Sequence, residues 1–245
     1  MPVSAASIAR FAAVLADRSR VEVCLALLDG RAWTAAELAR HVGIARSTAS
    51  EHLTALVKAG LLVERRQGRA RYLQLAGPEA AAAIEALGAA VGERVQPTSL
   101  RTARADAALA EARTCYDHLA GRQGVAVHDA LLAGGLLSDR GGLAVTARGR
   151  RWFVEVCGVP DEPPNSRRPL VRECLDWTER RSHLGGFLGA ALLRHALTVG
   201  WVTTVAAHPR ALRVTTAGEE LLAACSGGAA SAGQPDQVGH GQPGE

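Results

Sequence analysis

Apolar residues recur at helical spacing near the start of the chain. Those that repeat every three or four positions are Ile8, Phe11, Val14, Leu15, Val21, Leu25 and Leu28. This pattern predicts helix over residues 5–29. We expect a break between Asp17 and Ser19, with Ser19 capping the second segment and Gly30 ending it.

Two further helices are predicted next. Thr34 is followed three residues later by Glu37, which is the pattern of a capping box at the start of a helix. That helix stops at Gly43, where we expect a side chain to obstruct the close crossing of the two helices. Ser47 is expected to cap a longer helix over about residues 48–59.

Short apolar runs then flank an arginine-rich turn. Residues 61–63 and 72–75 are apolar or alternating, and the turn between them contains Gly68. This arrangement predicts a β-hairpin. An alanine-rich helix is expected over residues 78–95, with proline near its first turn. The order helix, turn, helix, hairpin is that of a winged helix–turn–helix.

Residues 8–90 resemble the ArsR/SmtB family of bacterial winged-helix repressors. The likeness is carried by the segments LADRSRVEVCLALLDG and TAAELARHVGIARSTASEHLTALVKAGLLVERRQGRARYLQL. The resemblance implies a homodimer that represses transcription and releases double-stranded operator DNA when a ligand binds, with the helix after the wing contributing to the dimer contact. Many metal-sensing members carry a cysteine pair at the start of the motif's first helix, but residues 29–36 contain no cysteine.

The second helix of the motif is expected to enter the major groove of DNA. Its candidate contact residues are Arg46, Ser47, Thr48, Ser50, Glu51 and His52. Arg46 can pair bidentately with guanine; the alternatives are that Ser47 serves only as a cap and that Glu51 orients Arg46. The wing is expected to contact phosphate or the minor groove through Arg65, Arg66, Arg69 and Arg71.

The charge distribution agrees with a polyanionic partner for the first third of the chain. Of the net charge of +4 over 245 residues, residues 1–75 contribute +5 and the remainder −1. A composition of 48% apolar and 21% charged residues indicates a globular protein. No apolar run reaches the length of about 18 residues that a membrane span needs. The N-terminus also lacks the basic cluster and following apolar stretch of a secretory signal, so we expect a cytoplasmic protein without membrane segments.

The second half contains an internal duplication. His118-Leu-Ala-Gly is echoed 65 residues later by His183-Leu-Gly-Gly, and residues 143–149 are echoed 69 residues later by residues 212–218. Each copy is expected to run helix, helix, strand, turn, strand, helix, with Thr146 and Thr215 capping the last helices.

These patterns predict a mainly α fold with small β-hairpins (α+β). Its expected parts are a DNA-binding and dimerisation domain at residues 1–95, a C-terminal region at 100–225 and a disordered tail at 226–245. The C-terminal region is expected to comprise two winged-helix-like repeats, at about 104–158 and 168–225. Proline-containing linkers are expected near residues 96–99 and 160–166.

Cysteine and histidine occur together at the start of each copy, as Cys115 with His118 and Cys174 with His183. On a helix the first two could reach one metal, whereas Cys174 and His183, nine positions apart, could not unless the helix breaks. Three interpretations stay open: buried core residues, a metal or haem site, and a thiol switch between Cys115 and Cys174. Five cysteines without a tight framework argue against a disulfide-stapled fold.

The sequence therefore predicts a sequence-specific DNA-binding regulator with its effector site in the second half. Five aromatic side chains could line an organic pocket there: Trp152, Phe153, Trp177, Phe187 and Trp201. The alternatives are that residues 100–225 form an enzyme or a dimerisation module. We expect no enzyme, because the sequence contains no nucleophile elbow, phosphate-binding loop or dinucleotide fingerprint.

Overall fold

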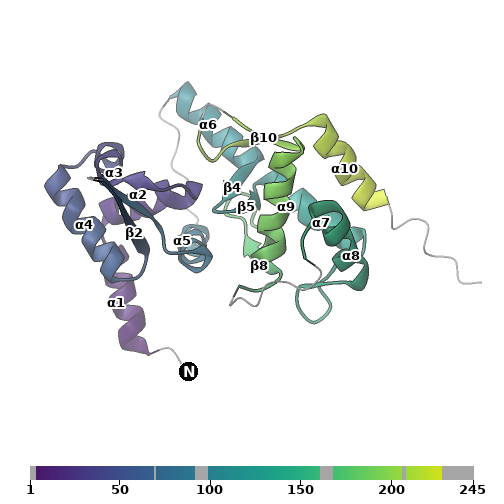
Figure 1. Ribbon diagram of the computed structural model, residues 1–245, viewed down its shortest axis with the longest axis horizontal. Helices are drawn as coiled ribbons and strands as arrows, with labels where there is room; N and C mark the ends of the chain where they lie inside the picture. The colour runs from purple at the N-terminus through teal and green to yellow at the C-terminus, as the bar shows by residue number, and fades with distance from the viewer. Residues whose placement is uncertain (1–3, 69, 92–98, 161–167, 206–207, 228–245) are drawn as a thin grey trace, which may run out of the picture.

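The computed structural model describes residues 4–68, 70–91, 99–160, 168–205 and 208–227. Figure 1 shows the N-terminal elements, in purple and blue, beside the C-terminal elements, in teal to yellow, with α5 next to β8 where the two groups meet. Within the described residues, no helix is long and apolar enough to cross a bilayer. The fold is mainly α with small antiparallel sheets, as predicted.

The N-terminal part is a winged helix–turn–helix. Its elements are α1 (Ala5–Leu15), α2 (Arg18–Ala26), the 3-10 turn η1 (Leu27–Asp29), β1 (Trp33–Thr34), α3 (Ala35–Val42), α4 (Arg46–Lys58), β2 (Leu62–Gln67), β3 (Ala70–Leu75) and α5 (Pro78–Val91). The predicted hairpin is β2–β3, and β1 adds a third strand beside β3 that the sequence did not reveal. The core beneath is built of leucines, with Cys24 fully buried among them; burial raises the pKa of this thiol to about 12.

The helix starts differ in part from the predictions. The capping box of Thr34 and Glu37 is present. At α2 the cap is Asp17 and not Ser19, because the Asp17 carboxylate accepts the Arg20 N–H at 3.0 Å. The prediction that Ser47 caps α4 was wrong: α4 begins at Arg46, so Ser47 lies one position inside the helix with its side chain exposed.

Gly43 is needed for its backbone conformation and not for close packing. Its φ of 75° lies in the left-handed region, which side chains disfavour. A Cβ built there would meet no atom within 4 Å. The expectation of an obstructed helix crossing was therefore wrong, although the turn does fall at this glycine.

The C-terminal part repeats a hairpin, a helix, a second hairpin and a helix. After α6 (Leu100–Glu111), the first copy contains β4 (Arg113–Cys115), β5 (His118–Ala120), α7 (Arg122–Ala133), β6 (Leu137–Ser138), β7 (Ala144–Val145) and α8 (Ala147–Cys157). The second contains β8 (Arg172–Leu175), β9 (Ser182–Gly185), α9 (Gly186–Thr198), β10 (Val202–Thr204), β11 (Leu212–Val214) and α10 (Thr216–Gly227). The two copies interlock, because α7 packs on β9 while α9 packs on β5.

The start of each copy is a hairpin where a helix was expected. In the first copy, β4 pairs with β5 and also receives a distant partner, since the Thr114 N–H donates to the Arg210 carbonyl at 2.9 Å. Pairing with a segment almost a hundred residues away is a tertiary contact that local helical spacing cannot reveal. The later elements agree with the prediction: Thr146 and Thr215 accept the N–H of Gly149 and Gly218 and so cap α8 and α10.

Several predicted features lie wholly or mainly outside the described residues. They are Arg69, the linkers near 96–99 and 160–166, and the tail at 226–245.

Candidate nucleic-acid interface and metal-ligand cluster

The first turns of α4 present a polar surface. Five of the predicted contact residues are exposed: Arg46, Ser47, Thr48, Ser50 and Glu51. The opposite face of α4 carries Leu53 and Leu56, both fully buried in the N-terminal core. The helix is therefore held by its apolar face, and the predicted recognition side is free to meet a ligand.

The wing lies against the middle of this helix. Arg71 on β3 reaches Ser50 and Thr54 of α4, with nitrogen–oxygen distances of 3.5 Å to each hydroxyl. The same guanidinium pairs with Glu64 on β2 at 2.8 Å, and this hydrogen bond is the main reason that the pKa of Glu64 lies below its ordinary value. Arg71 thus joins the wing to α4, so that the two form one continuous surface.

The other predicted DNA contacts are placed as follows. Arg65 and Arg66 are exposed on the wing, and Arg66 pairs with Glu64 at 3.1 Å. His52 points the other way: it is half-buried and accepts a hydrogen bond from Arg20 Nε at 3.2 Å. His52 is thus engaged with the start of α2 and stands apart from the exposed surface of α4.

Four buried side chains of the C-terminal part converge on one point. Cys115 pairs across its hairpin with His118, and Cys174 pairs across its hairpin with His183. One sulfur or nitrogen atom from each lies within 4.8 Å of those of the other three, and the two sulfurs are 3.8 Å apart. The helix assumed for Cys174 and His183 was wrong, and the condition that it must break is met. These residues are cross-strand neighbours on a hairpin, where nine positions of sequence do not separate them in space.

Both histidines of the cluster have buried ring nitrogens that lack hydrogen-bond partners. His118 Nε2 and both ring nitrogens of His183 are buried without hydrogen-bond partners, although such groups are normally satisfied. A carboxylate stands behind each ring: His118 Nδ1 lies 3.3 Å from Asp117 Oδ1, and His183 Nδ1 lies 3.5 Å from Asp176 Oδ2. Two hydrogen bonds from Arg168, of 2.6 and 2.9 Å, fix Asp117 in turn.

The pKa values of the two thiols are shifted in opposite directions. The hydrogen bond from Cys115 lowers the pKa of Cys174 to about 2, against the opposing effect of burial and with help from His118 and His183. The same hydrogen bond, together with burial, raises the pKa of Cys115 well above its ordinary value. Thiolate is the form of cysteine that binds metals, and Cys174 is the thiol of the pair whose pKa is lowered.

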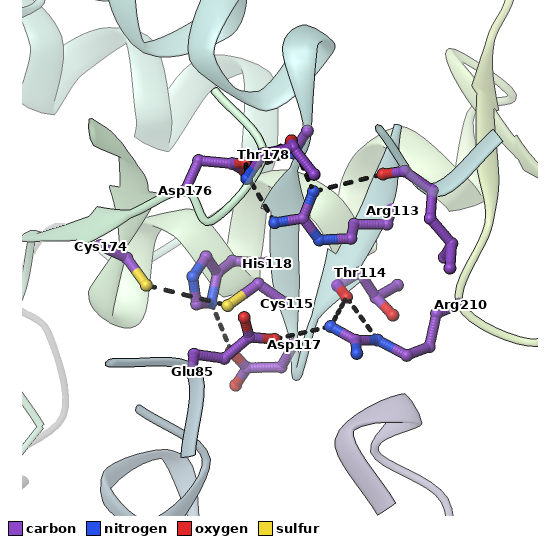
Figure 2. Close-up of polar contacts among 12 residues, drawn as sticks. Glu85, Arg113, Thr114, Cys115, Asp117, His118, Cys174, Asp176, Thr178 and Arg210 are labelled. Carbon is purple, nitrogen blue, oxygen red and sulfur yellow. Dashed lines mark hydrogen bonds and ion pairs between the residues drawn. The ribbon is translucent and has the colours of Figure 1, made fainter. Parts of the chain in front are cut away.

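A second network, which sequence reasoning missed, lies beside the cluster (Figure 2). Arg113 and Asp176 form a fully buried ion pair at 3.0 Å, and Asp176 also accepts the Gly121 N–H at 2.7 Å. These two residues come from different copies of the duplication. The one signal in the sequence is their position, because Arg113 lies two residues before Cys115 and Asp176 lies two residues after Cys174.

The cluster touches the N-terminal part through the hairpin that carries Cys115. The carbonyl of the adjacent Thr114 accepts hydrogen bonds from Arg210 at 3.0 and 3.1 Å, and Arg210 also pairs at 2.6 Å with Glu85, a buried residue of α5. Figure 2 shows this chain of contacts. Tyr116, at the tip of the same hairpin, packs against the N-terminal core.

The aromatic residues do not gather in one pocket. Trp152 and Trp201 line an apolar cavity of about 40 Å³ between the copies, and Phe153 and Phe187 border a separate cavity of about 10 Å³. Trp177 instead lies 4.7 Å from the Arg113 guanidinium, measured to the ring centre. The expected five-residue lining is therefore divided among three places.

Comparison with known proteins gives matches over both parts of the chain. Residues 15–65 match a family described as "Helix-turn-helix domain". The chain is 38% identical over 214 residues to the uncharacterized HTH-type transcriptional regulator YdfF of Bacillus subtilis, covering 87% of this chain and 94% of YdfF. It is 40% identical over 91 residues to the HTH-type transcriptional regulator CmtR of Mycobacterium tuberculosis, covering 37% and 70% of the two chains.

A solved structure is similar to part of the chain. It is the homodimeric winged helix-turn-helix DNA-binding domain of Mb0332 from Mycobacterium bovis, a possible ArsR-family regulator, at 25% identity and a TM-score of 0.35, covering 39% of this chain and 94% of that one. The likeness to YdfF includes the C-terminal part as well as the winged helix, so both this chain and YdfF are matched over most of their lengths. The chain thus belongs to the HTH-type transcriptional regulators.

Proposed function

We propose that the protein is a homodimeric repressor that binds a specific operator in the bacterial cytoplasm. The observation that carries this proposal is the joining of α4 and the wing by Arg71 into one exposed surface. Such a surface can place Arg46 and its neighbours on base edges while Arg65 and Arg66 lie along the phosphates. Arg71 connects the two elements through its contacts with Ser50, Thr54 and Glu64.

Two copies are proposed because a single recognition helix reads only a half-site. A dimer presents two such helices about one helical turn of DNA apart, which matches a palindromic operator. Large apolar side chains on α1 and α5 are available for the contact: Ile8 is 59% exposed, Leu87 49% and Val91 71%. A second copy of this chain would cover them, and the ArsR resemblance implies the same role for α5.

An enzyme carried by residues 100–225 is the weaker candidate. YdfF, which matches this chain beyond the winged helix, is named a transcriptional regulator. We propose that this region holds the effector site of the regulator and no catalytic centre. Turnover of a substrate by the full-length protein would contradict this assignment.

Replacing Arg46 by alanine is expected to weaken operator binding about 5- to 150-fold, because a bidentate contact to guanine contributes about 1–3 kcal/mol. Operator DNA would be obtained by selecting bound duplexes from a random-sequence library with the full-length protein. Affinity would then be measured by fluorescence anisotropy at several salt concentrations. The wild type should select a palindrome and show a steep salt dependence.

The matched control is Arg213→Ala, which removes the same charge from an exposed position on β11, far along the chain from α4 and the wing. This variant should bind the operator within about twofold of the wild type. If Arg46→Ala, folded by circular dichroism, binds as well as Arg213→Ala, the placement of α4 in the major groove is wrong. Selection of no common sequence by the wild type would contradict the proposed function as a whole.

A further inference from the structure

We propose that Cys115, His118, Cys174 and His183 together bind one tetrahedral divalent ion of the zinc class. This site lies in the duplicated part of the chain, outside the winged helix. It is built reciprocally, because each copy supplies one cysteine and one histidine from directly opposed positions of a hairpin. An ion held there would join the two copies at their interface.

The sulfur separation fits metal coordination. Zinc–sulfur bonds of about 2.3 Å in a tetrahedron place two thiolate sulfurs about 3.8 Å apart, and the two sulfurs here are 3.8 Å apart. A disulfide needs about 2.05 Å. A thiol switch would also leave the unpaired nitrogens of His118 and His183 without a purpose, whereas coordination to an ion satisfies one on each ring.

The surroundings complete such a site. Histidines that bind metal usually direct their second ring nitrogen at a carboxylate or carbonyl, which fixes the tautomer and orients the ring. Asp117 and Asp176 occupy these positions behind His118 and His183. Two thiolates balance the charge of a divalent ion, so the buried centre is neutral overall and escapes the cost of an unpaired buried charge.

The ligand set also selects the class of ion. Two sulfurs and two imidazole nitrogens favour zinc-like ions over magnesium or calcium, which prefer oxygen. Haem does not fit, because the backbone closes over the cluster: a Cβ at Gly185 would lie 3.4 Å from His118 Nε2 and 3.6 Å from the Cys174 Cβ. Four protein ligands leave no open position, as in sites that hold or sense an ion without catalysing a reaction on it.

The test is the metal content and spectrum of the full-length protein. Reduced wild-type protein dialysed against Zn²⁺ and then metal-free buffer should retain one zinc per chain by atomic emission. Loading with Co²⁺ should give sulfur-to-cobalt charge-transfer bands and the visible bands of tetrahedral cobalt. Cys174→Ser should weaken the charge-transfer bands, while Cys157→Ser, at the end of α8, should leave them unchanged.

Retention of less than a tenth of an equivalent of zinc, with no tetrahedral cobalt spectrum from the reduced wild type, would overturn the proposal. This outcome is informative even if the Cys174→Ser variant fails to fold, because it needs only the wild type. An unchanged cobalt spectrum in a folded Cys174→Ser variant would likewise overturn it. Neither measurement involves DNA, so failure here is distinct from failure of the proposed repressor function.

We further infer that occupancy of this site is transmitted to α5, an inference that rests on the proposed DNA-binding function. The contacts that connect the site to α5 are separate from the ligand geometry. The carbonyl of Thr114, next to Cys115, accepts a hydrogen bond from Arg210, and Arg210 pairs with Glu85 on α5. Tyr116 at the hairpin tip packs on the N-terminal core. Any displacement of this hairpin by the ion would therefore be passed to contacts made by the proposed dimerisation helix.

Zinc-loaded and zinc-free wild-type protein are expected to differ at least about fivefold in affinity for the selected operator, the lower end of ordinary allosteric coupling. In Glu85→Gln, which removes the charge but keeps the shape of the side chain, zinc should still bind at one per chain while the difference falls below twofold. The control is Glu79→Gln, the same change at an exposed position of α5.

Equal operator binding by zinc-loaded and zinc-free wild type would overturn the coupling. So would a fivefold difference that persists in Glu85→Gln. Absence of operator binding in both forms would instead contradict the proposed function, so that the two failures are distinguishable.

Discussion

Replacing Arg113 by methionine should lower the free energy of unfolding by about 3–5 kcal/mol, because it leaves a buried carboxylate without its counter-charge. Arg113 and Asp176 are both fully buried and 3.0 Å apart. The arginine also donates to the Leu109 carbonyl and to the Thr178 hydroxyl. Methionine fills much of the same space but replaces none of these donors.

The ion pair also holds the two copies together. Arg113 lies on β4 of the first copy, and Asp176 follows β8 of the second. Burial opposes ionisation of Asp176, but Arg113 and the hydrogen bonds from Thr178 and Gly121 outweigh it and hold the pKa of this carboxyl below its ordinary value. The pair therefore stays charged at neutral pH. Its loss is expected to weaken the contact between the two copies, because each copy supplies one of the two charges.

Urea denaturation followed by circular dichroism would measure the effect of Arg113→Met. The matched control is Arg122→Met, which breaks a pair with Glu111 in which both side chains are well exposed, at 63% and 44%. Exposed pairs contribute at most about 1 kcal/mol. Adding Asp176→Asn to Arg113→Met should recover part of the loss. Equal unfolding free energies for the two single variants would show that the buried pair contributes no more than a surface pair.

Replacing Gly149 by alanine should destabilise the C-terminal part by about 3 kcal/mol, the upper end for overpacking. Gly149 lies in the first turn of α8, and a Cβ there would overlap the Leu136 carbonyl oxygen. A backbone carbonyl cannot rotate away as the end of a side chain can. Either α8 or the strand β6 must therefore move, which disturbs the Thr146 cap that sets the start of α8.

The matched control is Gly88→Ala, the same substitution inside another helix. Gly88 is exposed on α5, and a Cβ there would meet no atom within 4 Å. Alanine should stabilise that helix by about 0.5–1 kcal/mol. Thermal unfolding of both variants would give melting temperatures that shift in opposite directions. A Gly149→Ala protein that melts at or above the wild-type temperature would refute the packing argument.

The Gly149 contact also explains one signal of the duplication. Gly218 of the second copy meets the Trp201 carbonyl in the same way, and Thr215 caps α10 as Thr146 caps α8. The repeated spacing of threonine and glycine therefore marks a helix start that lies against the preceding hairpin. Sequence comparison within the chain could find this repeat because cap and contact are both local to one supersecondary unit.

The winged helix was predictable for a related reason. Its helices are short and follow one another, α1 to α3 begin at side-chain caps, and its wing is a hairpin of adjacent strands. Contacts of this kind depend on residues that are close in sequence. The details that failed were single positions. Asp17 caps α2 in place of Ser19, because more than one polar residue at that junction could serve. The helix α4 starts at Arg46 after Ala45, without any side-chain cap, so a search for a polar cap residue misplaced its start by two positions.

By itself the sequence determined the winged helix, the exposed polar face at the start of α4 and the existence of a duplicated second half, since each depends on local periodicity, caps and spacing. The tertiary structure alone decided that Cys115, His118, Cys174 and His183 meet at one buried point. Their convergence depends on cross-strand pairing and on the interlocking of two copies about 60 residues apart. Helical spacing assigned these residues to the wrong element and set two of them on opposite faces. Long-range strand pairing leaves no periodic trace in a single strand of three or four residues.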